Sequence, residues 1–67
     1  MKDKPQPRYS IGKLVRVVLN ERNRTPHTGF IRQVIWHHKD GRYNYYLEEN
    51  GKKIAKRYFE EDLQPIP

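Results

Sequence analysis

The sequence predicts a small all-β domain, because its apolar residues gather in short runs and two hairpin signals separate those runs. The runs are rich in β-branched and aromatic residues, which favour strands. The hairpin signals are Asp40-Gly41 and Asn50-Gly51, since both dipeptides tolerate the positive φ angles of a two-residue turn. A length of 67 residues corresponds to one domain.

Residues 1–10 are expected to form a flexible tail. They contain two prolines and three basic residues, and they have no apolar face that could pack a strand or a helix. We therefore expect the folded domain to occupy residues 11–67.

The first strand is expected over residues 13–19 and is followed by a long loop. Side chains alternate between the two faces of a strand, so Arg16 faces solvent and the residues on the opposite face are apolar. The core positions expected here are Val15, Val17 and Leu19. Residues 20–28 are polar and contain a proline, so they predict the loop.

Three further strands are expected over residues 29–39, 42–48 and 52–58, with a tight turn between consecutive strands. The pairs that two-residue turns would create include Trp36 with Tyr45 and Leu47 with Ile54. The face expected in the core comprises Val34, Trp36, Tyr45, Leu47 and Ile54. The same face would carry Lys56, which indicates a bulge or a strong twist nearby.

The end of the chain is expected to form a single 3₁₀ turn and a short last strand. Residues 59–63 are too few for a stable α-helix but suit a 3₁₀ turn with Phe59 and Leu63 packed inward. Residues 64–66 follow as the last strand, where a proline is tolerated only at an edge.

A set of residues spread over these strands matches a known order of elements. The set is Val15 and Val17, Gly29-x-Ile31-x-x-Val34, Tyr45-x-Leu47 before Asn50-Gly51, and Leu63-x-Pro65-Ile66. Residues 11–66 thereby resemble the SH3-like small β-barrel, a group that includes Tudor, KOW and ribosomal-protein modules, and small bacterial proteins of that shape. The resemblance implies a five-stranded barrel with a 3₁₀ turn before the last strand. It does not fix a ligand, because such barrels bind RNA, DNA, peptides, methylated residues or other subunits.

The formal net charge of +6 permits binding to nucleic acid or to an acidic protein. Residues 1–24 hold seven basic and two acidic residues, a net charge of +5, whereas residues 48–67 hold four basic and five acidic residues. The positive field is therefore expected on the N-terminal third.

Other classes of protein and site are not expected. The absence of cysteine excludes disulfides and thiolate zinc sites. No apolar run reaches the ~18 residues of a membrane span and no secretory segment begins the chain, so we expect a cytoplasmic protein without membrane contact.

We also expect no enzyme, no cofactor and no metal. The one serine, Ser10, falls in the tail, away from any base. Glu48 and Glu49 flank a turn opposite two lysines, which suits cross-strand salt bridges. The residues taken as surface histidines are His27, His37 and His38, of which the last two point to opposite faces of a strand.

Basic and aromatic residues instead predict a surface for RNA or single-stranded DNA. Tyr46 and His37 are expected on one exposed face, where they would stack bases, and Lys and Arg side chains would neutralise phosphates. The expected contact residues are Lys13, Arg16, Arg22, Arg24, Arg32, His37, Tyr46 and Arg57. The alternative is a protein-interaction subunit that docks on an acidic partner or within a larger complex, steered by the same charge. In both cases we expect a monomer.

Overall fold

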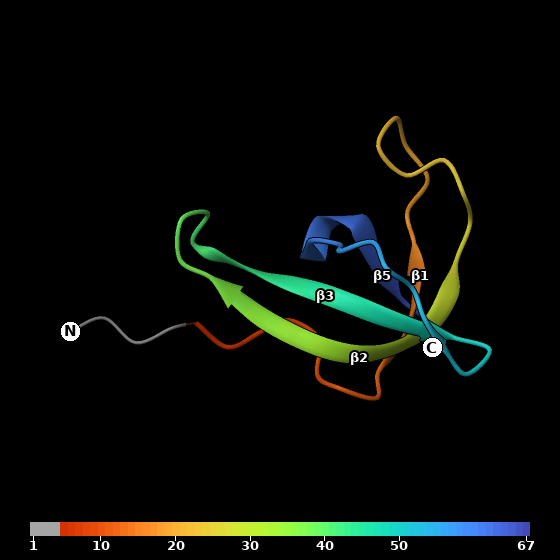
Figure 1. Cartoon of the computed structure of the whole chain (residues 1–67), viewed down its shortest axis with the longest axis horizontal. Coiled ribbons are helices and arrows are strands. Elements are labelled where there is room, and N and C mark those ends of the chain that lie inside the picture. The colour runs from red at the N-terminus through yellow and green to blue at the C-terminus, as the bar shows by residue number, and fades with distance from the viewer. Residues whose placement is uncertain (1–4) are drawn as a thin grey trace.

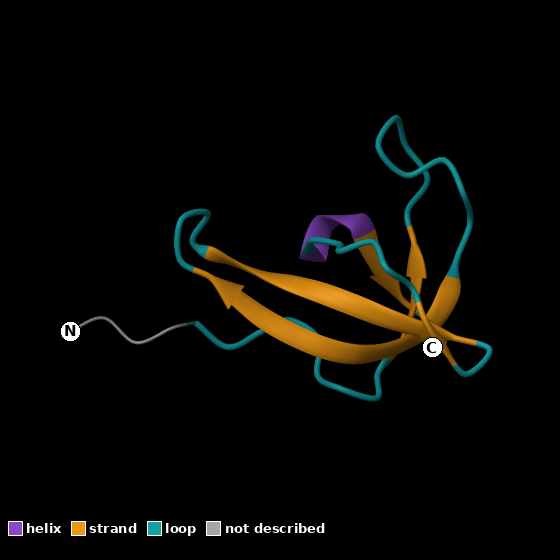
Figure 2. Cartoon of the chain, viewed as in Figure 1, coloured by secondary structure: helices purple, strands orange, loops and turns teal. Residues whose placement is uncertain are grey.

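The computed structural model describes residues 5–67, and these form five strands and one 3₁₀ turn (Figure 1, Figure 2). In chain order the elements are β1 (Leu14–Val17), β2 (Thr28–His37), β3 (Arg42–Glu49), β4 (Lys52–Lys53), η1 (Glu60–Asp62) and β5 (Leu63–Pro65). The strands pair antiparallel in one sheet of order β4-β3-β2-β1-β5. The predicted all-β class and the 3₁₀ turn before the last strand are therefore confirmed. None of these residues forms a helix long and apolar enough to cross a membrane.

Strand β1 is shorter than the sequence predicts. Val15 and Val17 are buried and Arg16 is exposed, as alternation predicts. Leu19 was expected in the core, but this expectation is wrong, because its side chain is 56% exposed. The strand ends at Val17, and the next amide, of Val18, donates to the carbonyl of Asp62. Beyond this point the chain leaves the sheet, so the period of two no longer decides which side chains are buried.

The β2–β3 hairpin has a longer loop than the predicted two-residue turn. His37 pairs with Arg42, so the loop covers residues 38–41, and the amide of Gly41 donates to the carbonyl of His37. The register therefore differs from the prediction by two residues, and Val34, not Trp36, lies opposite Tyr45. A shift of two residues keeps each side chain on its face. Four of the five predicted core positions are confirmed, with Tyr45 and Leu47 buried and Val34 and Ile54 packed against the core. Trp36 is partly buried but does not pack against the buried core cluster, so this expectation is wrong.

The second hairpin follows the sequence closely up to Lys53 and then departs from it. Asn50 and Gly51 have φ angles of 53° and 77°, as a turn of this type requires. The predicted strand over residues 52–58 ends at Lys53, and Tyr58, not Lys56, lies opposite Tyr45. Two extra residues in this segment leave Lys56 exposed and bring the apolar ring of Tyr58 into the core.

A bulge in β2 changes which of its side chains face the core. Pairing with β3 shifts between Ile31 and Gln33, so Ile31 and Val34 face the core although they differ in parity. Phe30 consequently points away from the core and is 52% exposed. This bulge in β2 was not predicted.

The described part of the N-terminal segment packs against the sheet. Tyr9 is 4% exposed, its ring lies edge-on to Tyr45 with centroids 5.7 Å apart, and its hydroxyl donates to the carbonyl of Leu63 at 3.3 Å. The hydroxyl of Tyr43 donates to the carbonyl of Pro5 at 2.7 Å. The flexible tail expected over residues 1–10 therefore does not describe residues 5–9. Residues 1–4 lie outside the described part of the chain.

Replacing Tyr9 tests this packing. Tyr9→Ala should destabilise the domain by about 3–5 kcal/mol, as expected when a large buried ring is truncated. Ser10→Ala, at an exposed neighbouring position, should change the stability by less than about 0.5 kcal/mol. Urea unfolding followed by tyrosine and tryptophan fluorescence measures the stability of both variants. If the two variants were equally stable, the packing of Tyr9 would be contradicted and the interpretation as a flexible tail would be correct.

Gly29 allows β3 to approach β2 closely. It is buried, and a Cβ built on it would overlap the carbonyl oxygen of Glu48. Gly29→Ala should therefore lower the free energy of unfolding by about 1–3 kcal/mol, the usual cost of overpacking. Thr28→Ala, at the adjacent exposed position, is the matched control and should be nearly neutral in the same urea titration.

Candidate functional site

Most described carboxylates lie in ion pairs, and all of these pairs except His37–Asp40 join side chains distant in sequence. The pairs are Arg8–Glu60, Arg22–Asp62, His27–Glu49, Arg32–Glu48, His37–Asp40 and Arg42–Glu61, with N···O distances of 2.6–3.7 Å. The predicted cross-strand salt bridges from Glu48 and Glu49 to Lys52 and Lys53 are therefore wrong. The backbones pair as predicted, but the carboxylates reach Arg32 and His27 of the neighbouring segments instead.

This pairing leaves a group of cations without acidic partners at one edge of the sheet. We call this group the basic edge, and it consists of Arg24, Lys52, Lys53, Lys56 and Arg57. Within residues 5–67, none of the five has a carboxylate oxygen within 4.0 Å. Lys52 and Lys53 form the edge strand β4, and the segment after β4 carries Lys56 and Arg57.

The basic edge adds free cations to those of the N-terminal third, where Lys13, Arg16 and Arg24 also have no carboxylate partner among the described residues. Residues 48–67 have a slightly negative formal charge, but their carboxylates neutralise cations of other segments, such as Arg22 and Arg32. The lysines and Arg57 of the same stretch remain without acidic partners among the described residues. Local net charge along the sequence is thus a poor guide to where the free charge lies.

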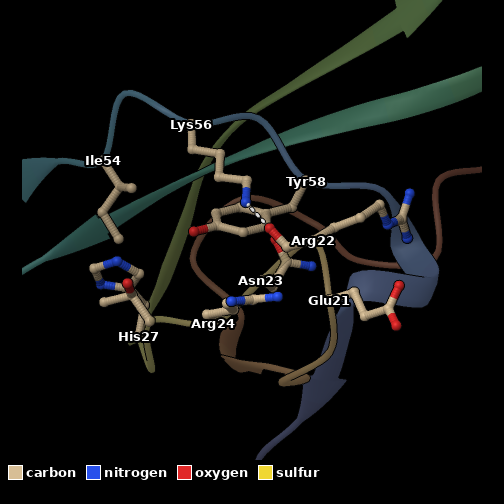
Figure 3. A pocket seen from close by; sticks show the side chains of 9 residues that line it. Glu21, Arg22, Asn23, Arg24, His27, Ile54, Lys56 and Tyr58 are labelled. Atoms are coloured by element: carbon tan, nitrogen blue, oxygen red, sulfur yellow. Dashed lines mark hydrogen bonds between the residues drawn. The ribbon is translucent and has the colours of Figure 1, made fainter.

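A pocket of about 300 Å³ lies at the basic edge, between the loop after β1 and the segment after β4 (Figure 3). Its walls are formed by Glu21, Arg22, Asn23, Arg24, Thr25, His27, Ile54, Lys56 and Tyr58. Tyr58 and Asn23 are buried, at 2% and 4% exposure, and the Nδ2 atom of Asn23 has no hydrogen-bond partner within residues 5–67. Arg24 and Lys56 bring two members of the basic edge to this one pocket.

The loop that forms one wall of the pocket is held by several hydrogen bonds. The Asn20 side chain accepts from the amides of Arg22 and Asn23, and the ammonium of Lys56 donates to the carbonyl of Arg22 at 2.6 Å. The Arg22 guanidinium turns the other way and pairs with Asp62 at 2.6 Å. Asp62 also accepts from the amide of Phe59 at the start of η1. The pocket is therefore preformed, because both of its walls are fixed to the rest of the fold.

Arg22 differs from its expected role. Its partner Asp62, in η1, is only 4% exposed. Arg22 was expected to bind phosphate, yet its guanidinium is engaged with this buried carboxylate. A buried carboxylate requires a charged or hydrogen-bonding partner, so Arg22 is primarily a structural residue.

His27, which lines the pocket, is paired with Glu49, which does not line it. Glu49 accepts from the amide of Thr28 at 3.0 Å and lies 2.9 Å from Nδ1 of His27. The hydrogen bond from Thr28, followed by that from His27, lowers the pKa of Glu49 below its ordinary value of 4.5. Burial raises the pKa of Tyr58 above 10.0, and the negative charges of Asp62 and Glu49 raise it further. Tyr58 therefore presents a neutral hydroxyl at neutral pH, able to donate a hydrogen bond.

The outer face of the sheet, opposite the core, carries a second group of polar and aromatic side chains. Lys53 lies over the ring of Tyr46, 4.6 Å from its centroid, and approaches the Gln33 side chain. The exposed ring of Phe30 lies opposite Glu48 in the sheet register. Through Lys53, the basic edge thus continues onto an aromatic surface.

The structure brings together only some of the predicted contact residues. Arg24 lies at the pocket, Arg57 lies on the basic edge, and Tyr46 lies beneath Lys53. Lys13 precedes β1, Arg16 contacts Gln64 of β5 at the sheet edge opposite β4, and Arg32 pairs with Glu48. His37 lies on the outer face with Tyr46, but it is four residues beyond the partner of Tyr46, about 13 Å along β2.

The residues that sequence reasoning missed are Asn23, Lys52, Lys53, Lys56 and Phe30. The lysines were assigned to salt bridges or to a misplaced core position, and no signal in the sequence reveals which carboxylates pair elsewhere. Phe30 could have been found, because apolar residues at Ile31 and Val34 differ in parity and therefore indicate a bulge. Among residues 5–67, no group of three His, Asp or Glu side chains is arranged to hold a metal ion.

Comparison with known proteins gives a family for the chain. The model of a family of unknown function, DUF6960, matches residues 1–64. The chain belongs to the DUF6960 family. No curated protein and no solved structure matches the chain. The pocket and the basic edge lie within the part that the family model matches.

The lowered pKa of Glu49 predicts a pH-dependent contribution to stability. Because the pKa of Glu49 is lower in the folded state than the unfolded value of 4.5, the ionised carboxylate stabilises the fold at pH values above 4.5. This contribution is lost as the pH falls through the lower folded-state pKa. Glu49→Gln should therefore be less stable than the wild type at neutral pH, and the difference should shrink steadily below pH 4.5.

Urea unfolding midpoints at a series of pH values measure this difference. Glu21→Gln is the matched control, since Glu21 is exposed and has no ion pair within the described residues. A Glu49→Gln difference that stays constant down to about pH 2–3, well below ordinary carboxyl pKa values, would contradict the linkage.

Proposed function

We propose that this protein is a non-catalytic binding module of the SH3-like small-barrel type that binds single-stranded nucleic acid along the basic edge. The fold assignment is supported by the sheet order β4-β3-β2-β1-β5 and by η1 before β5, which agree with the resemblance found in the sequence. The ligand assignment is supported by the charge distribution.

One observation carries the proposed function. The acidic residues that lie near the basic edge in sequence are paired elsewhere, so Lys52, Lys53, Lys56 and Arg57 follow one another without carboxylate partners among the described residues. A row of unneutralised cations attracts the phosphates of a nucleic-acid backbone and releases their counterions. Without an anionic partner these neighbouring cations would repel one another, so the binding of an anion is favoured.

The surroundings of the basic edge favour a single strand over a duplex. Tyr46 and the exposed ring of Phe30 lie on the outer face near Lys53, and exposed aromatic rings next to cations stack unpaired bases. A pocket is also more accessible to an unpaired nucleotide than to one held within a helix.

A second candidate function is docking on an acidic protein. The exposed apolar residues Phe30 and Ile35, at 52% and 39% exposure, lie on the outer face and favour a contact with another protein. Purification of the protein from its own cells distinguishes the candidates. A stoichiometric acidic protein that remains bound after nuclease treatment would replace nucleic acid as the partner.

Salt dependence tests the proposed function directly. Five phosphate contacts predict a slope of about −3.5 when log K for a single strand is plotted against log salt, at about −0.7 per contact. Lys52→Gln and Arg57→Gln should each reduce this slope by about 0.7. Fluorescence anisotropy with a labelled oligonucleotide of mixed sequence measures the slopes.

Lys39→Gln provides the matched control for these variants. It removes the same charge from the tip of the β2–β3 hairpin, where Lys39 also has no carboxylate partner within residues 5–67 (Figure 1). Its slope should equal that of the wild type. If all three variants lose affinity equally, the interaction reflects total charge and the basic edge is not the binding surface.

A further inference from the structure

The pocket at the basic edge is lined by two cations that come from different segments. Arg24 belongs to the loop after β1, and Lys56 belongs to the segment after β4. Neither has a carboxylate oxygen within 4.0 Å among residues 5–67. Glu21, the one acid that lines the pocket, lies at the opposite end from His27 (Figure 3). The pocket therefore has a local excess of positive charge.

The ammonium of Lys56 is held in place rather than free to move. It donates one hydrogen bond to the carbonyl of Arg22 at 2.6 Å, and the Arg22 side chain is itself tied to Asp62. An ammonium has three N–H donors, so two of them are left for a ligand. A fixed cation loses less entropy on binding than a flexible one, which favours tight binding of an anion.

Hydrogen-bond donors complete the walls around these cations. Asn23 is 4% exposed and its Nδ2 has no partner within the described residues, and Thr25 adds a hydroxyl. The ring of Tyr58 forms an almost fully buried wall. Donors next to fixed cations suit the oxygens of a phosphate, which accept charge-assisted hydrogen bonds.

Size and shape distinguish among phosphate-bearing ligands. A volume of about 300 Å³ is at the lower limit for small-molecule sites, so it suits a phosphate with part of its substituent. A phosphodiester inside a strand continues on both sides, whereas Asn23 and Tyr58 close one side of this pocket. A phosphate monoester continues on one side only, and it carries a charge of about −1.5 to −2 at neutral pH.

We propose that the pocket binds a phosphate monoester, and that the phosphorylated end of a nucleic-acid strand supplies it. The rest of the strand would then follow the basic edge from the pocket toward Arg57, Lys52 and Lys53. This inference rests on the proposed function and narrows it from any single strand to a strand with a terminal phosphate.

The test compares one oligonucleotide in three forms, with a 5′-phosphate, with a 3′-phosphate and with neither. One phosphorylated form should bind at least about tenfold more tightly than the unphosphorylated form, which corresponds to a single charge-assisted contact. Arg24→Gln and Lys56→Gln should remove this preference. Gln at position 56 keeps a donor that can reach toward the carbonyl of Arg22 while removing the charge.

Two further variants make the comparison decisive. Lys56→Arg restores the charge and should restore the preference, which separates loss of charge from loss of loop structure. Lys39→Gln should keep the full preference, since Lys39 lies at the hairpin tip outside the pocket. Thermal unfolding of each variant confirms that it is folded.

The outcomes separate this inference from the proposed function. Equal, salt-dependent binding of all three forms overturns the monoester site and leaves strand binding along the basic edge intact. Binding of adenosine monophosphate or inorganic phosphate, seen as NMR shifts at the amides of Asn23 and Arg24, without binding of any strand would keep the monoester site and overturn the strand as its source. No binding of any of these probes overturns both.

Discussion

The backbone pairing of Tyr45 with Tyr58 is the constraint on which most of this fold depends. The two residues exchange hydrogen bonds of 2.7 and 2.9 Å, and both rings are almost fully buried. The Tyr45 hydroxyl also accepts from the amide of Arg8, so one side chain anchors the N-terminal segment as well. Burial is the main cause of the raised pKa of Tyr45, whose hydroxyl therefore stays neutral at neutral pH. A domain of this size has few core residues, and a residue with several structural roles has a correspondingly large effect on stability.

The same pairing also positions the candidate site. Because Tyr58 lies opposite Tyr45, the chain between Lys53 and Tyr58 must leave the sheet, and this excursion presents Lys56 and Arg57 to solvent. Asp62 then binds Arg22 and thereby fixes the facing loop. The pocket is thus formed between two segments that are each anchored to the core at one end, which explains how so short a chain holds a preformed concave site.

Local patterns in the sequence were sufficient to predict the strands but not their exact boundaries or their charge environment. Asn50-Gly51 fixed one turn correctly, since its conformation depends on those two residues alone. Asp40-Gly41 did not, because the hairpin closes with His37 opposite Arg42 and the dipeptide is only part of a four-residue loop. Tyr9 resembled a tail residue, since a single aromatic flanked by prolines and charges has no periodic pattern, although it fills a place in the core.

The candidate site was less predictable than the fold, because ion pairs join residues far apart in sequence. Of the predicted contact residues, Arg22 and Arg32 are engaged with carboxylates that only the folded chain brings near, whereas Arg24 is not. A count of charges along the chain treats all three alike. The allocation of carboxylates by the fold therefore decides which cations remain available, and in this protein the stretch with the lowest formal charge keeps four cations without a carboxylate partner among the described residues.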